Sequence, residues 1–164
     1  MGKELADCLE NGTETGIPEK DIVIFQIPQY EIHDKSIELT VKSGKGDIPI
    51  LIKPDSTRSD YRAFYEYKQG DIKYPWTQKK VDNDDQMTFY STGLYEITGY
   101  MPESELIWAV TEKRIDPDGI ERPHYTGEIR RFKTKRTLSQ ILKMKVRMSK
   151  AWKEIGKMME EEIL

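Results

Sequence analysis

The stretch of residues 48–90, IPILIKPDSTRSDYRAFYEYKQGDIKYPWTQKKVDNDDQMTFY, carries the elements that decide the fold. It opens on a β-rich run over residues 48–52 and, after a polar loop, enters an alternating aromatic segment over residues 61–68. Apolar side chains then recur at helical spacing from Thr77, a suitable N-cap, to Gly99, a terminating glycine. Two strands followed by a helix are therefore expected at the centre of the chain.

The sequence on either side of this stretch predicts further strands and a closing helix. The pattern Thr137-Leu-Ser-Gln140 is a capping box, which marks the start of the last helix. Strands are expected at residues 22–27, 37–41, 106–111 and 127–132, a short helix and loop at 1–20, and a final helix at 137–163. The order (α)ββββαββα predicts an α/β fold that borders on α+β, with helices covering a mixed central sheet. We expect one domain over residues 1–164, with its core at 21–133.

Composition excludes several classes of protein. The chain has 164 residues, which is one ordinary domain, and its formal net charge is −3. Its single cysteine, Cys8, excludes a disulfide framework and a four-cysteine iron–sulfur cluster. The sequence has no run of about 20 apolar residues and no apolar stretch behind its first basic residues, so that neither a membrane span nor a signal peptide is expected. We therefore expect a cytoplasmic protein.

Asp55, Glu66 and Lys68 form the pattern that carries chemistry. A hairpin brings the ends of adjacent strands together, so that Asp55 and Glu66 could face one another, and Glu66 and Lys68 point to one face because they are two residues apart. Two convergent carboxylates suit Mg²⁺, and a nearby ammonium group could orient an attacking water or balance charge on a phosphate. More commonly such acids are solvated, and a Glu-x-Lys pair is a surface ion pair worth under ~1 kcal/mol.

Gln86 and Tyr90 lie four residues apart on the predicted helix and therefore share one of its faces. They could donate hydrogen bonds to a phosphate or steady the strand ends. Each of these features is common by itself. Their order along the chain, Pro-Asp, then Glu-x-Lys, then Gln-x-x-x-Tyr on a helix, is much less common.

This order resembles the PD-(D/E)xK nuclease superfamily, and more narrowly its RecB-like exonuclease branch. The resemblance rests on Pro54-Asp55, Glu66-Tyr67-Lys68 and Gln86-Met-Thr-Phe-Tyr90, and it extends over residues 21–133. It implies a restriction-endonuclease-like core and hydrolysis of DNA phosphodiester bonds, as in repair or recombination, that depends on one or two Mg²⁺ or Mn²⁺ ions. By resemblance, Asp55, Glu66 and the backbone carbonyl of Tyr67 are metal ligands. Lys68 acts on the nucleophilic water, and Gln86 and Tyr90 support the site and contact DNA.

The distribution of charge supports a nucleic-acid partner in spite of the net acidity. Between Arg122 and Lys153 the chain carries eleven basic residues and one acid, Glu128. The densest part of this stretch predicts phosphate contacts that do not depend on base sequence. The predicted DNA-binding residues are Arg130, Arg131, Lys133, Lys135 and Arg136, with Trp76 as a residue that could stack on unpaired bases or, equally, pack against the core.

Alternatives to an active nuclease follow from the same sequence. Members of the branch often carry a His on a helix before the first strand, whereas His33 and His124 do not match that position. This difference leaves open a nuclease-derived module that binds nucleic acid or a partner without cleaving, and a helicase or a larger parent protein is a possible partner. A third hypothesis is an interaction domain that uses the Met- and Trp-rich last helix.

Overall fold

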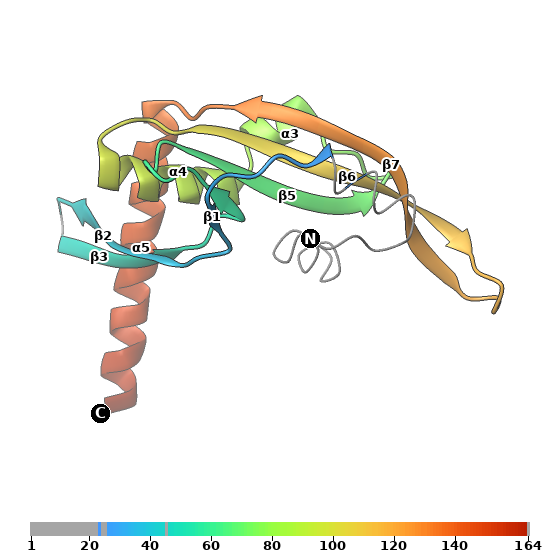
Figure 1. The fold of residues 1–164 in the computed structure, drawn as a ribbon. Coiled ribbons are helices and arrows are strands. Elements are labelled where there is room, and N and C mark those ends of the chain that lie inside the picture. The colour runs from blue at the N-terminus through green and yellow to red at the C-terminus, as the bar shows by residue number, and fades with distance from the viewer. Residues whose placement is uncertain (1–22, 24–25, 45, 164) are drawn as a thin grey trace.

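The computed structural model describes residues 23, 26–44 and 46–163, and the helix predicted within residues 1–20 lies outside them. Figure 1 shows a long, curved sheet with helices on one side and a small hairpin below it. The elements are β1 (Ile32–His33), β2 (Ile37–Ser43), β3 (Gly46–Ile52), β4 (Ser56–Thr57), β5 (Ala63–Asp71), α3 (Gln78–Asp82), α4 (Asp85–Thr98), β6 (Glu103–Ile115), β7 (Glu121–Thr134) and α5 (Leu138–Ile163).

The central sheet is mixed, as the sequence predicts. Its strand order is β1-β4-β5-β6-β7, in which β5 and β6 are parallel and the other neighbours are antiparallel. Parallel neighbours need a long crossover, and the segment that carries α3 and α4 supplies it. The described part of the chain is therefore a mixed α/β structure with a five-stranded sheet.

The hairpin β2–β3 forms a two-stranded sheet of its own rather than an extension of the central one. Helix α4 lies between the two sheets, so that Leu94 and Tyr90 share a buried cluster with Phe64 of β5 and Ile52 of β3. A Cβ on Gly93 would lie 2.9 Å from Ile52 Cδ1, which is too close. A residue without a side chain at position 93 is thus what lets α4 approach the hairpin.

The structure corrects three details of the predicted elements. Val23 and Gln26, within the segment predicted as a first strand, are helical. The single helix expected from Thr77 to Gly99 is two, because the Asp84 side chain accepts a hydrogen bond from the Met87 N–H and starts α4 anew. The strands β5, β6 and β7 extend beyond their predicted ends, and the short strands β1 and β4 were not predicted.

Three predicted helix ends are confirmed. Thr77 caps α3, and Gly99 ends α4 in the left-handed conformation at φ 73°. The capping box at α5 is present, because the N–H groups of Thr137 and Gln140 each donate to the other residue's side chain. Local capping chemistry therefore sets these boundaries.

The sheet is covered on both faces along its centre. One face packs against α3 and α4, while the other carries a second cluster that includes Val23, Tyr67, Ile107 and Tyr125. Strand β6 is consequently buried at every position from Ser104 to Thr111, as is typical of a strand with a parallel neighbour.

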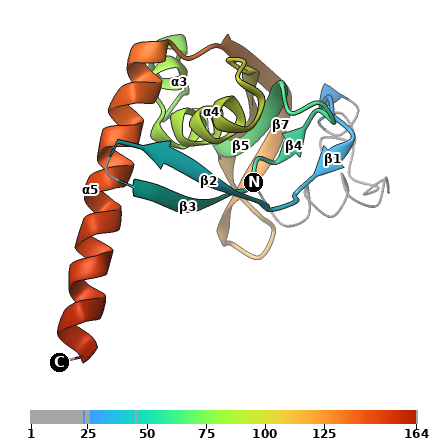
Figure 2. The same ribbon diagram turned by 90° about the vertical axis from the view of Figure 1, so that its left-hand side faces the viewer.

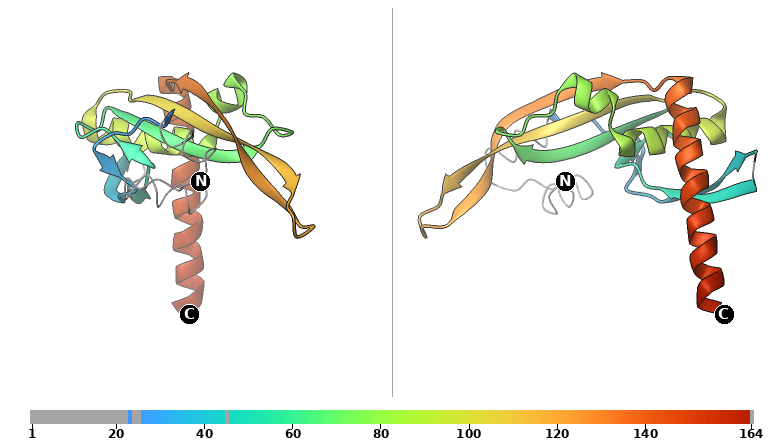
Figure 3. Two further views of the ribbon diagram at one scale, coloured as in Figure 1. Left: turned by 45° about the vertical axis from the view of Figure 1, so that its right-hand side comes forward. Right: turned by 180° about the vertical axis from the view of Figure 1, so that it is seen from behind.

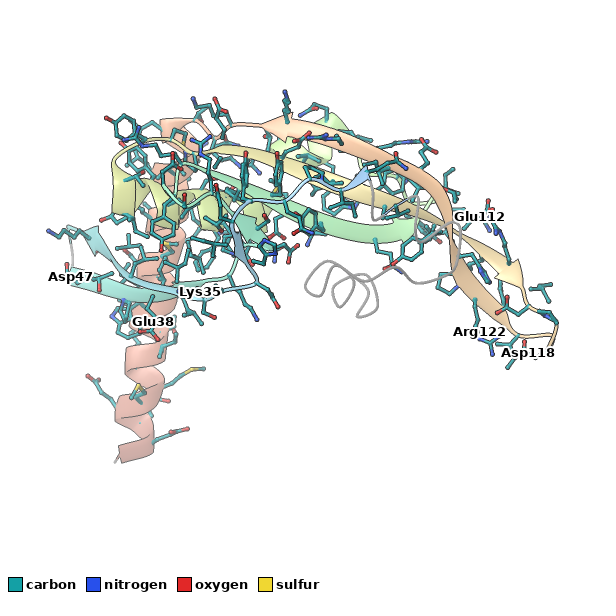
Figure 4. All side chains as sticks on the ribbon, viewed as in Figure 1. Lys35, Glu38, Asp47, Glu112, Asp118 and Arg122 are labelled. Carbon is teal, nitrogen blue, oxygen red and sulfur yellow. The ribbon has the colours of Figure 1, made fainter. Side chains whose placement is uncertain are left out.

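Two segments extend beyond the layered body. The outer parts of β6 and β7 form a twisted two-stranded arm (Figure 3), on which Figure 4 labels Glu112, Asp118 and Arg122. Helix α5 packs beside β2–β3 and then continues past them (Figure 2). Among the described residues, no helix has both the length and the apolar character needed to cross a membrane.

Candidate metal and nucleic-acid site

Asp55 and Glu66 lie next to one another because β4 pairs with β5. Asp55 directly precedes β4, whose Ser56 is paired with Tyr65, the residue before Glu66. The Asp55 N–H donates to Glu66 Oε1 at 2.9 Å, and Asp55 Oδ2 accepts a hydrogen bond from the Tyr67 N–H at 2.8 Å. Both acids are therefore fixed by backbone groups and point into the same region at the edge of β5.

The backbone carbonyl of Tyr67 belongs to the same edge. The N–H and C=O groups of one residue in a strand point to the same side, and the Tyr67 N–H points toward Asp55. The Tyr67 side chain is anchored elsewhere, since its hydroxyl donates to the Pro28 carbonyl at 2.6 Å. Two carboxylates and one carbonyl oxygen therefore share this edge of the sheet.

Burial makes the carboxylate pair unusually basic. Glu66 is 2% exposed, and its burial together with the neighbouring charge of Asp55 raises the pKa of Glu66 to about 8. Burial also raises the pKa of Asp55, although the hydrogen bond from the Tyr67 N–H opposes this. Near neutral pH the pair therefore retains a proton more readily than ordinary carboxylates do.

Lys68, Gln86 and Tyr90 continue the site as a chain of hydrogen bonds. Lys68 Nζ lies 3.9 Å from Glu66 Oε2 and donates to Gln86 Oε1 at 2.6 Å. Gln86 Nε2 in turn donates to the Tyr90 hydroxyl at 3.1 Å. The structure therefore brings together all five residues that the sequence predicts as catalytic, from β4 and β5 on one side and α4 on the other.

Helix α4 holds its two residues in place through the core. The Tyr90 ring packs edge-on against Phe64 at 6.0 Å, and Tyr90 is only 9% exposed. Burial and the nearby Glu66 charge raise the pKa of Tyr90 to about 12, which keeps its hydroxyl protonated at neutral pH. Gln86 lies one turn earlier, where the helix surface is exposed, and bridges the core and Lys68.

The residues present fit a hard divalent cation. Each carboxylate gives one oxygen to a backbone N–H, which leaves Asp55 Oδ1 and Glu66 Oε2 as the oxygens that a cation could take. Mg²⁺ and Mn²⁺ favour oxygen ligands and commonly keep several waters, so that two carboxylates and a carbonyl suffice. Within the described residues no three His, Cys, Asp or Glu side chains converge on one point, so the side-chain ligands here number two.

The predicted DNA-binding residues do not form one surface, and Arg136 must be removed from them. Arg136 is 3% exposed, and its guanidinium donates to Thr88 and Thr134 hydroxyls and to two main-chain carbonyls, those of Val81 and Asp84. It joins the ends of α3 and β7 to the start of α4. Because its donors are directed inward, Arg136 stabilises the fold and does not present a charge to phosphate.

Arg130 is the basic residue that shares a face with Lys68. The register pairs Lys68 with Trp108 on β6 and Trp108 with Arg130 on β7, so the three form a row across the sheet. The Arg130 guanidinium lies over the Trp108 ring, 5.2 Å from its centre, and also pairs with Glu128 at 2.7 Å. Sequence inspection missed Trp108, because only the strand register reveals its position between the two basic residues.

Arg131, Lys133 and Lys135 lie elsewhere. Arg131 is opposite Ile107 in the register, on the face that carries the second cluster, and forms a two-bond pair with Glu105 at 2.7 and 2.8 Å. Together with Tyr30 and Tyr65, these three basic residues line a cavity of about 520 Å³. Glu103 and Glu105 line the same cavity, so that its charge is mixed.

Trp76 packs rather than stacks freely. It contacts the buried cluster beneath α4, and Lys80 Nζ lies 4.0 Å from the centre of its ring. Of the two interpretations of Trp76 that the sequence leaves open, the structure therefore favours packing against the core.

Comparisons of this chain with protein-family models, with curated proteins and with solved structures found no match.

Proposed function

We propose that the chain is a metal-dependent phosphodiesterase that acts on DNA. More specifically, we propose a PD-(D/E)xK nuclease of the RecB-like exonuclease type, with a restriction-endonuclease-like core and a role in cytoplasmic DNA repair or recombination. The observation that carries the proposal is that the Asp55 N–H donates to Glu66 and the Tyr67 N–H donates to Asp55, which sets the two carboxylates side by side, with Lys68 at 3.9 Å from Glu66.

Each residue has a chemical role in this proposal. Asp55, Glu66 and the carbonyl of Tyr67 would hold Mg²⁺ or Mn²⁺, which when bound lowers the pKa of an attacking water and offsets charge on the phosphate. Lys68 Nζ would orient that water or the scissile phosphate. Gln86 accepts from Lys68 Nζ and donates to the Tyr90 hydroxyl, so that both residues keep the ammonium group directed at the site.

The proposed DNA path runs over the face that carries Lys68 and Arg130. Arg130 keeps a partly exposed guanidinium above Trp108, two strands from Lys68, although it is paired with Glu128. Adjacent strands are about 4.8 Å apart, so two strands span roughly 10 Å. Contacts of this kind read phosphates and not bases, so that binding depends little on sequence.

A second candidate function rests on the ligand count. Only two metal-ligating side chains converge among the described residues, so that a cation held there would keep most of its ligands as water. A nuclease-derived module that binds nucleic acid, alone or beside a helicase or within a larger protein, would keep the same fold without turnover. Such a module would bind DNA in a salt-dependent way in the absence of metal.

Incubation of the protein with linear DNA and Mg²⁺ or Mn²⁺ distinguishes the two functions. We expect cleavage by the wild type, and a loss of at least about 100-fold in Asp55→Asn and Lys68→Ala. Asp60→Asn and Lys73→Ala are matched controls on nearby exposed positions and should cleave as the wild type does. DNA binding without any metal-dependent cleavage by the wild type would favour the second function, and equal cleavage by all variants would contradict the assigned site.

A further inference from the structure

A row of side chains crosses the central sheet beside the cavity of about 520 Å³. The register pairs Tyr65 of β5 with Glu105 of β6, and Glu105 with Lys133 of β7. Paired residues of neighbouring strands point to the same face of a sheet. Tyr65 packs against the second cluster, so that this row lies on the face of the sheet opposite α4.

One wall of the cavity is aromatic. The rings of Tyr30 and Tyr65 stack with their centres 4.3 Å apart and their planes 8° from parallel. Burial and a hydrogen bond between these two side chains raise the pKa of Tyr30 to about 12. Both residues line the cavity and are only partly buried. The pair therefore forms a fixed flat surface of the kind on which nucleic-acid bases stack.

Two ammonium groups lie beside this wall. Lys133 and Lys135 line the cavity and are exposed, and neither forms an ion pair with another residue in the part of the chain that the structure describes. The charge of Arg131, by contrast, is balanced by its two bonds to Glu105. Lysine ammonium groups are common ligands of phosphate in proteins. The cavity thus offers two positive charges to an anionic group.

Glu103 gives the cavity a carboxylate as well. It is exposed, forms no ion pair with the other described residues, and its charge contributes to the raised pKa of Tyr30. Glu103 therefore lies within electrostatic reach of the aromatic wall. An ionised carboxylate accepts hydrogen bonds and donates none, so that it favours a ligand with N–H groups.

From this combination we propose that the cavity binds a nucleoside monophosphate, either free or as an unpaired nucleotide of a DNA strand. The base would stack on Tyr30, the phosphate would contact Lys133 and Lys135, and Glu103 would accept a hydrogen bond from an amino group of the base. The volume of the cavity lies within the usual range of small-molecule sites. A phosphate ion alone would leave the aromatic wall unused, and a wholly apolar ligand would leave the charges unused.

Calorimetric titration of the full chain with deoxycytidine 5′-monophosphate (dCMP) in EDTA tests this proposal. We expect saturable binding of one dCMP per chain. Deoxycytidine, which lacks the phosphate, and deoxyribose 5-phosphate, which lacks the base, should each bind at least about tenfold more weakly. An absence of saturable binding at millimolar dCMP would overturn the proposal, as would equally tight binding of deoxyribose 5-phosphate.

Variants assign the binding to this cavity. Lys133→Ala with Lys135→Ala should lower the dCMP affinity at least about tenfold. Lys42→Ala with Lys113→Ala removes the same charge from exposed positions elsewhere and should bind as the wild type does. An equal loss in the two double variants would contradict the assignment.

Tyr30 provides a test of stacking with a matched control. Tyr30→Leu should lower the dCMP affinity at least about fivefold, whereas Tyr30→Phe keeps the ring and should stay within about twofold of the wild type. Thermal denaturation checks that both variants are folded. Wild-type affinity in a folded Tyr30→Leu chain would overturn the proposal.

Competition for bound dCMP distinguishes the two sources of the nucleotide. A single-stranded deoxycytidylate oligomer of about eight nucleotides should displace dCMP at lower concentration than free dCMP does if the cavity serves a DNA strand, and at higher concentration if it serves a free nucleotide. A blunt duplex should not displace dCMP, because paired bases cannot stack on Tyr30, and displacement by the duplex would contradict the proposal. These outcomes are independent of cleavage, since no metal is present and neither Asp55 nor Glu66 lines the cavity.

Discussion

The backbone N–H of Asp55 donates to the Glu66 side chain at 2.9 Å, so that the second acid of the motif holds the first in place. This bond joins the segment before β4 to the middle of β5, eleven residues further along the chain. The carboxylate of Asp55 in turn accepts from the residue that follows Glu66. The two acids therefore depend on one another for position as well as for chemistry.

Substitution of Glu66 should separate its structural role from metal binding. In Glu66→Gln the amide oxygen can still accept from the Asp55 N–H, so we expect unfolding free energy within about 1 kcal/mol of the wild type. The affinity for Mn²⁺ should fall at least tenfold, because an anionic ligand is lost. Thermal denaturation and calorimetric titration with Mn²⁺ measure the two effects. Undiminished Mn²⁺ affinity would show that Glu66 is not a ligand.

Tyr90→Phe should affect activity more than stability. The ring remains packed against Phe64, but Gln86 Nε2 loses the hydroxyl that accepts its hydrogen bond. We expect a loss of less than about 1.5 kcal/mol in unfolding free energy, and a several-fold lower cleavage rate because Gln86 no longer fixes Lys68. Single-turnover cleavage with saturating DNA measures this rate. An unchanged rate would exclude a positioning role for Tyr90.

Arg136→Lys should be strongly destabilising even though it conserves charge. One ammonium group cannot reproduce the guanidinium bonds to the Thr88 and Thr134 hydroxyls and to the carbonyls of Val81 and Asp84. We expect a loss of about 2–4 kcal/mol, since buried acceptors are left unsatisfied. Urea denaturation measures this loss. The control is Lys135→Ala at the exposed neighbouring position, which should lower the unfolding free energy by less than about 0.5 kcal/mol. A small effect at Arg136 would restore it as a candidate for DNA contact.

Glu96 should make the attachment of α5 sensitive to acid. Burial raises its pKa, but hydrogen bonds from Lys145 Nζ and the Lys42 N–H outweigh this, so that the pKa of Glu96 lies below the usual 4.5. A carboxyl whose pKa is lower in the folded state than in the unfolded state stabilises the fold at pH values above its unfolded-state pKa. This stabilisation is lost as the pH falls through the folded-state pKa. Glu96→Gln should thus be about 1 kcal/mol less stable than the wild type at pH 7, and the difference should shrink as pH falls below 4.5 and disappear once pH is below the lowered pKa of the folded state. Urea midpoints measured across this pH range test the expectation, which a constant difference would contradict.

Arg130 and Arg131 should differ in their contribution to DNA binding. Arg130 lies on the face of Lys68, whereas Arg131 lies on the other face and is paired with Glu105. We expect Arg130→Ala to weaken DNA binding. It should also reduce the slope of log K against log salt concentration by about one, which is the contribution of one phosphate contact. Arg131→Ala should have less effect on both. Fluorescence anisotropy with a short duplex over a range of salt concentrations measures both. The reverse order would place the DNA on the opposite face.

Much of the fold and of the candidate site follows from local sequence. The caps at Thr77, Gly99 and Thr137 were predictable, because a cap depends on residues within one turn of the chain. The five residues from Asp55 to Tyr90 were also found in the sequence, since their spacing along strands and a helix is itself the signal. The break at Asp84 was missed, because the apolar spacing continues through it and only the N-cap bond to Met87 reveals a new helix.

The sequence by itself determined the types of the elements, several of their ends and the residues of the acidic site. Only the tertiary structure decided which basic residues share a face with that site. Neighbouring residues of β7 point to opposite faces, so that Arg130 and Arg131 separate although they are adjacent in the chain. The parallel register between β5 and β6 then brings Lys68 into line with Trp108, and folding buries Arg136 among main-chain carbonyls. Charge density along the chain carries no information on such pairings, because they are set by long-range packing of the sheet.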